Sequence, residues 1–345
     1  MEQKRRTPSG DAMPVTSHDV AQRAGVSQST VSRVLTGDSA VRETTRQRVL
    51  AALEELNYAP NVAARTMKTG RTGAIAVVIS RLTNPFYPEL LDAVSEAALE
   101  AGLHVIVMNA EMDGEADAAR ALRARSVDGV ILATATEESA KLWSGYDRSA
   151  PIVLINRVVE SLPFAQITGD HVSGSAEVAR FFLKHGRQRI ALITAPLSAS
   201  TTAEREAGFL DALAADKAPV NSGNIMRAAA VSHEEGRQAM LFLLRQPQRP
   251  TAVFCVSDLL AIGAIDAARE LNISVPGDIW VVGFDNVQLA SWGGYQLTTV
   301  SQPAKEMARR GVKALLDRLD KPRARTEIVR LPTQLVIRES ARSWF

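Results

Sequence analysis

At 345 residues, with 46% hydrophobic and 5% aromatic side chains, the chain is longer than one typical domain and too apolar to be largely disordered. Its only cysteine, Cys255, excludes an intrachain disulfide, residues 1–14 form a polar tail without the apolar core of a signal peptide, and no stretch matches a membrane span, so we expect a cytoplasmic protein. The net charge of +2 conceals an asymmetry: residues 1–72 hold 11 Lys and Arg against 7 Asp and Glu, which makes this part the expected partner for phosphate.

The sequence after the tail is predicted to form two short helices around a tight turn. Thr16 and Asp19 have the spacing of a capping box, in which a hydroxyl accepts a free helix amide and a carboxylate suits the positive helix end. Gly25 supplies the backbone freedom needed to leave the first helix. Ser27 is a natural cap for a second helix that begins at Gln28.

These two helices have an apolar face and a polar, cationic face. The expected core residues are Val20, Ala21, Ala24, Val31, Val34 and Leu35, and the residues on the opposite side are Gln28, Ser29, Ser32 and Arg33. A second helix that presents its N-terminal side chains to the major groove is the helix-turn-helix arrangement. The alternative is an ordinary helix pair exposed to solvent.

A third amphipathic helix is predicted over Thr44–Leu56, where Val49 and Leu53 help to close a three-helix core. Pro60 stops this helix, and Asn61 can cap one more helix of about two turns. Such a short helix is marginal in isolation.

The run Asp19-Val-Ala-x-x-Ala-Gly-Val-Ser-x-x-Thr-Val-Ser-Arg33, followed by Leu56-Asn-Tyr-x-Pro-Asn61, resembles the signature of the lactose-repressor (LacI/GalR) family of bacterial transcription regulators. The resemblance implies a DNA-binding headpiece over residues 15–60 and a hinge helix with linker over residues 61–71. It also implies a nucleoid-associated homodimer that acts as a repressor. The homodimer is expected to bind double-stranded operator DNA of near-palindromic sequence. The DNA-binding residues implied are Thr16, Ser27, Gln28, Ser29, Thr30, Ser32, Arg33, Asn61, Ala64 and Met67.

Within that set, Gln28, Ser29 and Arg33 match base-contacting positions, and the hinge matches a segment that kinks the operator from the minor groove. The family usually carries an intercalating Leu where this chain has Met67. Met is apolar and long enough to act as a wedge, but it is more flexible.

Residues 72–345 alternate apolar runs with helix-length segments, which predicts βαβ units and parallel sheets. The expected strands are Ile75–Ile79, Val105–Met108, Gly129–Leu132, Ile152–Ile155, Ile190–Ile193, Val253–Val256 and Ile279–Val282. They are too many for one compact sheet, and the pattern restarts near His171. The resemblance implies an α/β, two-lobed, periplasmic-binding-protein-like core that binds an effector and dimerises. It implies crossings near residues 171, 299 and 330, giving lobe one about 72–171 and 300–329 and lobe two about 172–299 and 330–345.

Neither an enzyme nor a metal or cofactor site is expected. The sequence has no dinucleotide-binding glycine motif, no Walker A loop and no nucleophile elbow, and the five histidines lack metal-ligand spacing. A solute-binding protein for transport shares the two-lobed pattern, but the headpiece and the absence of a signal peptide oppose it.

Polar and aromatic side chains follow several strand ends, where open parallel sheets leave a crevice. The effector-binding residues implied by the resemblance are Phe86, Tyr87, Asn156, Arg157, Arg205, Ser257, Asp285 and Trp292. Core packing is an equal alternative for Phe86, and surface salt bridges explain Arg157 or Arg205 equally well when each is considered alone. Asp258 is placed either at the effector or as a cap of the following helix.

The expected effector is a small polar metabolite such as a sugar or sugar acid. Val231 stands where many sugar-binding relatives have a stacking aromatic, and Ala203 replaces a polar neighbour of the ligand arginine. Arg81, Arg157 and Arg205 near the crevice favour a carboxylate or phosphate. The chain lacks the heptad tail of tetrameric relatives, so a dimer is expected. The resemblance implies an interface formed by the helix Tyr87–Ala101 and neighbouring segments.

Overall fold

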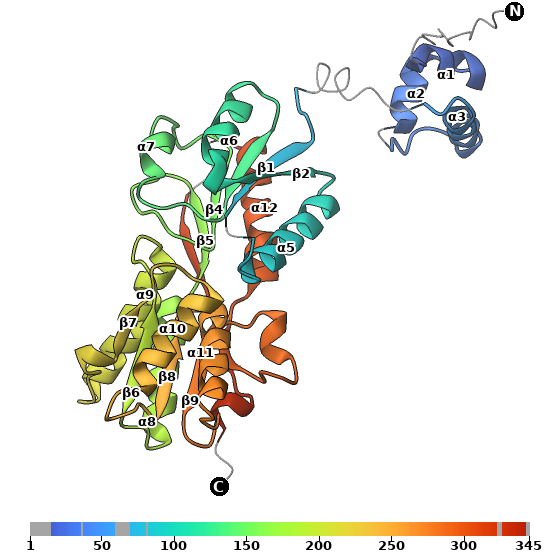
Figure 1. Ribbon diagram of the computed structural model, residues 1–345. Coiled ribbons are helices and arrows are strands. Elements are labelled where there is room, and N and C mark those ends of the chain that lie inside the picture. The colour runs from blue at the N-terminus through green and yellow to red at the C-terminus, as the bar shows by residue number, and fades with distance from the viewer. Residues whose placement is uncertain (1–14, 36, 59–69, 81, 323–325, 343–345) are drawn as a thin grey trace, which may run out of the picture. The chain divides into compact units, whose positions relative to one another are not determined.

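The computed structural model describes residues 15–35, 37–58, 70–80, 82–322 and 326–342 (Figure 1). The chain divides into two compact units, Met1–Thr72 and Gly73–Phe345. The hinge positions Asn61, Ala64 and Met67, and also Arg81, lie outside the described residues.

The first unit is helical and consists, in its described part, of α1 (Ser17–Ala24), α2 (Gln28–Leu35) and α3 (Glu43–Glu55). The predicted capping box is confirmed: the Asp19 amide donates to Thr16 Oγ1, and the Asp19 carboxylate accepts from the Thr16 amide. Gly25 ends α1 with φ 62°, a left-handed conformation that suits glycine. The Arg48 side chain donates to the Ala24 and Gly25 carbonyls, which neutralises the negative end of α1.

The core of this unit is small and lies where the three helices meet. Its buried members are Val20, Ala21, Ala24, Val31, Val34, Val49 and Ala52. Leu35, expected in this core, is 41% exposed, so that prediction is wrong. It is the last residue of α2, where the neighbouring helices no longer cover this face.

The second unit contains, among its described residues, two six-stranded sheets. In spatial order the first sheet consists of β2 (His104–Asn109), β1 (Ala74–Ile79), β3 (Gly129–Leu132), β4 (Ile152–Ile155), β5 (Ala165–Gly169) and β11 (Ile328–Leu331). Every neighbouring pair in it is parallel. We call this sheet with its helices the first lobe.

Helices cover both faces of the first sheet, and alternate residues along a strand therefore enter different cores. The helices are α5 (Phe86–Glu100), α6 (Gly114–Arg123), α7 (Ala140–Trp143) and α12 (Ala304–Asp320). Odd-numbered residues 75–79 of β1 pack in the core shared with α5 and α12, and even-numbered ones pack in the core shared with α6 and α7. Figure 1 shows α12 beside α5, although they are far apart in the sequence.

The second sheet is parallel except at one edge, where β10 and β12 are antiparallel. We call this sheet with its helices the second lobe. In spatial order it consists of β7 (Ile225–Arg227), β6 (Ile190–Thr194), β8 (Ala252–Cys255), β9 (Trp280–Asp285), β10 (Thr298–Ser301) and β12 (Gln334–Val336). Its helices are α8 (His171–Lys184), α9 (Ser200–Ala215), α10 (His233–Leu244) and α11 (Asp258–Glu270). The first lobe has one short 3-10 helix in the described ranges, η1 (Ala110–Met112), which follows β2. Those of the second lobe are η2 (Ser222–Asn224), η3 (Gln288–Ser291) and η4 (Glu339–Ala341).

In the described ranges the chain passes between the sheets three times, after β5, after β10 and after β11. The second and third crossings thus follow Ser301 and Leu331, slightly later than residues 299 and 330. The expected fold class, a helical N-terminal unit and a two-lobed α/β core, is confirmed. Cys255 is buried in β8, as the apolar run around it predicts. None of the helices in the described ranges has both the length and the apolar composition that a membrane-spanning helix requires.

The contact between α10 and α11 gives a test of packing in the second lobe. Gly263→Ala is expected to lower the free energy of unfolding by roughly 1–3 kcal/mol. The added Cβ would clash with the His233 carbonyl oxygen, so the two helices would have to separate. Chemical denaturation of the full chain measures the effect.

The matched control for this experiment is Gly145→Ala, at a position where an added Cβ meets no atom within 4 Å. Equal stability changes in the two variants would contradict the close helix contact at Gly263.

Candidate functional site

The polar face of α2 is the candidate nucleic-acid interface. Ser27, Gln28, Ser29 and Arg33 are exposed, and Thr30 and Ser32 are half-buried. Ser27 caps the helix, because its Oγ accepts from the Thr30 amide at 3.2 Å. The described part of this interface thus brings an amide, a guanidinium and several hydroxyls to one end of a short helix.

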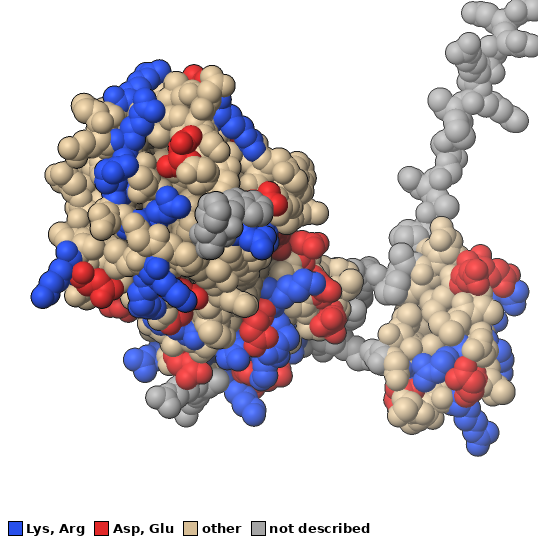
Figure 2. Space-filling view, turned by 90° about the horizontal axis from the view of Figure 1, so that it is seen from below, with Lys and Arg blue, Asp and Glu red and all other residues tan. Residues whose placement is uncertain are grey.

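Two of these side chains already have partners within the first unit. Gln28 Nε2 donates to Ser17 Oγ at 2.7 Å, and Arg33 Nε lies 4.0 Å from an Asp38 carboxylate oxygen. Thr16 caps α1 and is exposed. Basic and acidic side chains are mixed on the face that Figure 2 shows, so surface charge by itself marks no single binding face there.

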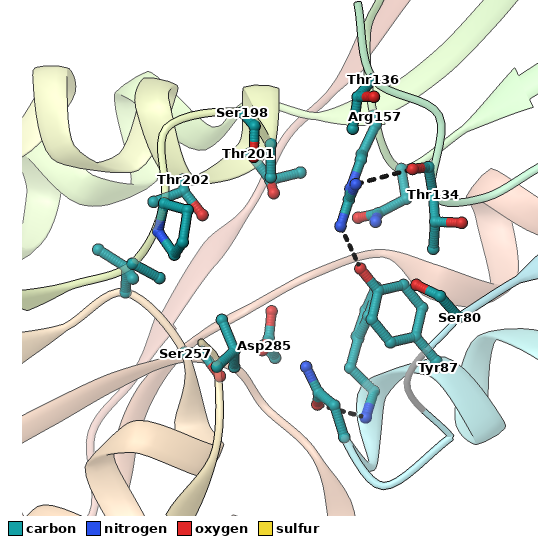
Figure 3. Close-up of a pocket in the computed structure, with 18 of the residues that line it drawn as sticks. Ser80, Tyr87, Thr134, Thr136, Arg157, Ser198, Thr201, Thr202, Ser257 and Asp285 are labelled. Carbon is teal, nitrogen blue, oxygen red and sulfur yellow. Dashed lines mark hydrogen bonds between the residues drawn. The ribbon is translucent and has the colours of Figure 1, made fainter. Parts of the chain in front are cut away.

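A cavity of about 280 Å³ in the second unit is the candidate small-molecule site (Figure 3). It is lined by residues of both lobes, at the carboxyl ends of parallel strands. Seven of the eight residues expected there line it: Phe86, Tyr87, Asn156, Arg157, Arg205, Ser257 and Asp285. Trp292 does not line this cavity; it follows η3 and is 54% exposed.

On the first-lobe side, Arg157 reaches into the cavity beside Tyr87 (Figure 3). Its guanidinium donates to the Thr134 carbonyl at 2.7 Å and to the Tyr87 hydroxyl at 3.0 Å. Asn156, directly after β4, has φ 70°, a left-handed conformation that asparagine tolerates better than most residues. Phe86 packs edge-on against Tyr87, with ring centroids 5.7 Å apart. Phe86 therefore combines core packing with lining of the cavity.

On the second-lobe side, Arg205 and Asp285 form a buried ion pair at 3.0 Å. The Arg205 guanidinium also donates to the Val256 carbonyl at 2.7 Å and lies 3.9 Å above the Phe284 ring. Burial raises the pKa of Asp285, and the adjacent Arg205 opposes that rise. A buried donor beside a buried acceptor can bind two adjacent hydroxyl groups, one accepting from arginine and one donating to aspartate.

His171 is a residue of this site that the sequence analysis missed. It is fully buried at the start of α8, its Nδ1 accepts from Arg205 Nε at 3.3 Å, and its Nε2 lies 3.1 Å from Thr168 Oγ1. Burial and the Arg205 charge lower the pKa of His171 well below its usual value. A neutral imidazole in this place accepts from Arg205 and fixes the direction of the guanidinium.

Ser257 and Asp258 have different tasks, and neither alternative expected for Asp258 is found. The helix cap is Ser257 instead, and Asp258 does not line the cavity. Ser257 is the N-cap of α11 and lines the cavity, whereas Asp258 is buried behind it. The Asp258 carboxylate accepts from the Val287 amide at 2.9 Å and from the Thr299 hydroxyl. Burial, and secondly the charge of Asp285, raise the pKa of Asp258 to about 7.

Hydroxyl side chains that the sequence analysis did not single out make up much of the remaining wall. They are Ser80, Thr134, Thr136, Ser198, Thr201 and Thr202. Ser80, Thr134, Thr136 and Ser198 lie within four residues of the end of β1, β3 or β6, so their place after a strand was the available signal, whereas Thr201 and Thr202 lie in the first turn of α9. Across the described positions, no group of three His, Cys, Asp or Glu side chains could hold a metal ion.

Comparison with known proteins gives matches along most of the chain. Residues 16–61 match bacterial regulatory proteins of the lacI family, and residues 179–341 match the periplasmic binding protein-like domain. The chain is 36% identical over 334 residues to the HTH-type transcriptional regulator DegA of Bacillus subtilis (strain 168), covering 95% of this chain and 98% of that protein. It is 34% identical to the HTH-type transcriptional repressor PurR of Proteus mirabilis (strain HI4320), covering 93% and 95%.

Solved structures agree with these matches. The lac repressor dimer bound to operator and the anti-inducer ONPF has a TM-score of 0.82 at 29% identity, covering 95% of this chain and 99% of that chain. The cellobiose complex of the transcriptional regulator CelR has a TM-score of 0.71 at 28% identity, covering 94% and 99%. The family resemblance of the N-terminal motifs is confirmed.

The raised pKa of Asp258 predicts how stability depends on pH. A carboxyl group whose pKa is higher in the folded than in the unfolded state stabilises the fold at low pH, and this stability is lost as pH rises through about 7. Asp258→Asn does not titrate and keeps a similar shape. Relative to this variant, wild type is expected to lose on the order of 2 kcal/mol of unfolding free energy between about pH 5 and pH 8.

Urea denaturation of both proteins at several pH values measures this difference. Asp211→Asn, at an exposed position of α9, is the control. A wild-type advantage over Asp258→Asn that grows as pH rises would show that the sign is wrong.

Proposed function

Since the chain belongs to the lacI family of bacterial regulatory proteins, we propose that it acts as a dimeric repressor whose operator affinity is set by a small polar effector. It is a transcriptional regulator, as its relatives are, and not an enzyme. In this proposal residues 15–60 bind operator half-sites, residues 61–71 act as the hinge, and the second unit binds the effector.

The exposed polar end of α2 supports the DNA-binding role. Amide and guanidinium groups such as those of Gln28 and Arg33 can pair with base edges in the major groove, and serine hydroxyls can pair with phosphates. A structurally similar solved protein is a lac repressor dimer bound to operator. Two copies of this chain related by a two-fold axis would meet a near-palindromic site.

Exposed apolar side chains on one edge of the first lobe support dimer formation. Strand β2 is an edge strand, and its Ile106 and Val107 are 42% and 46% exposed. Leu99 on the neighbouring helix α5 is 72% exposed. Because soluble proteins rarely leave such apolar surface uncovered, this edge suits contact with a second copy.

The single observation that carries effector control is that the cavity is lined by both lobes. Arg157 and Tyr87 come from the first lobe, and Arg205 and Asp285 come from the second. A ligand that contacts both walls binds one relative lobe orientation better than another, and this difference in affinity is what allostery requires.

Direct contacts between the lobes stabilise the lobe orientation seen in this structure. Arg330 of β11 forms a two-pronged salt bridge with Glu204 of α9, at 2.7 and 2.9 Å. Glu89 of α5 accepts from the Gln288 amide at 2.8 Å. A change in lobe orientation would have to rearrange both contacts, so they define the arrangement against which the ligand acts.

Single substitutions on α2 test the DNA-binding part. Gln28→Ala and Arg33→Ala are each expected to weaken binding to the preferred operator by about 1–3 kcal/mol, because a base contact is lost. Loss of a base contact relaxes specificity at one position, whereas loss of a phosphate contact weakens all sequences and flattens the salt dependence. Operators are first selected from a random DNA pool with the full chain, and affinities are then measured by gel shift at several salt concentrations.

The control for these variants is Arg180→Ala, at an exposed position of α8 in the second lobe. A selection that yields no near-palindromic sequence would contradict binding as a two-fold dimer. If neither α2 substitution changes operator affinity, the proposed recognition helix is wrong.

A further inference from the structure

The N-terminus of α9 meets the cavity without a capping side chain. Ala199 occupies the N-cap and offers no side-chain acceptor, and the first turn of this helix contains no Asp or Glu. Ser198, Thr201 and Thr202 from this end line the cavity (Figure 3). The amides of Thr202 and Ala203 already donate to the Ala199 carbonyl, so the amides of Ser200 and Thr201 are the ones available to an anion. Amides at this end of a helix carry partial positive charge, which favours an anion.

The guanidinium of Arg157 belongs to the same end of the cavity. Ser200, the first residue of α9, accepts through Oγ a hydrogen bond of 2.9 Å from the amide of Val158, which directly follows Arg157. Figure 3 shows Arg157 on one side of the cavity, bonded to Thr134 and Tyr87, and Ser198 and Thr201 on the other side. The segment that carries Arg157 thus contacts the first residue of α9, and Arg157 and the N-terminus of α9 line the same cavity.

Buried polar atoms at this end have no partner within the protein. Thr134 Oγ1, Asn156 Oδ1 and Arg157 Nε are buried and make no hydrogen bond, and the Thr134 and Asn156 side chains belong to residues only 5% and 2% exposed. Two of these atoms can donate and one can only accept. The three residues line the cavity, although these atoms are closed to solvent in this structure. A carboxylate or phosphate oxygen would satisfy the donors after a rotation of the side chains around them.

The acidic residues of the cavity do not cancel this preference. Asp285 is paired with Arg205 at 3.0 Å and accepts from Gln302 at 2.7 Å. Glu111 also lines the cavity but is exposed to solvent. Arg157, by contrast, forms no salt bridge with any residue that the structure describes. A ligand anion at Arg157 would thus gain a charge-assisted hydrogen bond that the protein itself leaves unmade.

We propose that the effector is a small polyhydroxylated anion. Its carboxylate or phosphate lies between Arg157 and the N-terminus of α9, and its hydroxyl groups lie on Arg205 and Asp285. Val231 leaves the cavity without a stacking aromatic at its position, which fits a ligand held by charge and hydrogen bonds. This inference rests on the proposed function in one respect, that the cavity is the effector site.

Isothermal titration of the full chain with matched ligand pairs tests the ligand class. D-Gluconate and D-galacturonate carry a carboxylate, D-glucose 6-phosphate carries a phosphate, and D-glucose and D-galactose are the neutral counterparts. At least one anion is expected to bind at least about tenfold tighter than its neutral counterpart at equal ionic strength. The anion that binds identifies which group the site takes.

Two substitutions test the position of the anion. Arg157→Gln is expected to weaken binding of the anion by about tenfold or more, with little effect on the neutral counterpart. Ala199→Asp places a carboxylate on the free amides of α9 and should weaken binding of the anion to a similar extent. Asn has the shape of Asp without its charge, so Ala199→Asn caps the helix and should weaken binding of the anion much less. Thermal unfolding checks that both Ala199 variants fold. Both are expected to do so, because an Asp or Asn cap should stabilise α9.

Arg125→Gln is the charge-matched control, because Arg125 is exposed on the first lobe and does not line the cavity. Equal or tighter binding of the neutral sugars, or of uncharged nucleobases, would overturn the inference, as would a lack of binding by every anion tested. Equal affinity of the anion for wild type and Arg157→Gln would also overturn it. A separate gel shift with operator keeps the proposed function distinguishable: an anion that binds as expected but leaves operator affinity unchanged refutes effector control and not the ligand class.

Discussion

Burial of the Arg205 guanidinium is the constraint on which the second-lobe wall of the cavity depends. An unpaired buried charge is strongly destabilising, so each polar face of this group must have a partner. Asp285 supplies the opposite charge, the Val256 carbonyl and His171 accept hydrogen bonds, and the Phe284 ring lies against the guanidinium plane. These partners come from β9, α8 and the segment after β8, so the ion pair exists only when the second lobe is assembled.

The same network reaches the segments that join the two lobes. Gln302, in the crossing that follows β10, donates to Asp285 at 2.7 Å. Thr333, in the crossing that follows β11, donates to the carbonyl of Asp170, which precedes α8. The wall of the cavity and the crossings therefore share hydrogen bonds. Under the proposed function, a ligand hydroxyl on Asp285 would contact a carboxylate that the crossing segment already holds. The site would then lie next to the segments that have to bend if the lobes move.

The sequence predicted local features best where one residue type has one physical task. The capping box at Thr16 and the glycine at position 25 are examples, because their geometry depends on neighbours within four residues. Aliphatic strands were also found, whereas β5 and β10 were missed because Gln166, Thr168 and Thr298 are polar residues buried by tertiary contacts that no local pattern records. In the cavity, charged and amide side chains after strand ends were predicted, but common residues such as Thr134 and Ser198 carry no signal of their own.

Buried side-chain atoms without a hydrogen-bond partner gather around the cavity. In the described part of the chain, four of the six buried side-chain atoms without a partner belong to residues that line the cavity or contact Asp285: Thr134, Asn156, Arg157 and Gln302. Two lining residues, Asn156 and Asp285, have φ of 70° and 130°, of which the second is the less favourable because asparagine tolerates the left-handed conformation better than most residues. Seven other non-glycine residues in the described ranges also have positive φ, so this strain is not confined to the cavity. Unmade hydrogen bonds and backbone strain destabilise the fold, so stability alone does not account for these residues. Under the proposed function, the polar side chains of Thr134, Asn156 and Arg157 are retained because they line the cavity that would hold a polar ligand.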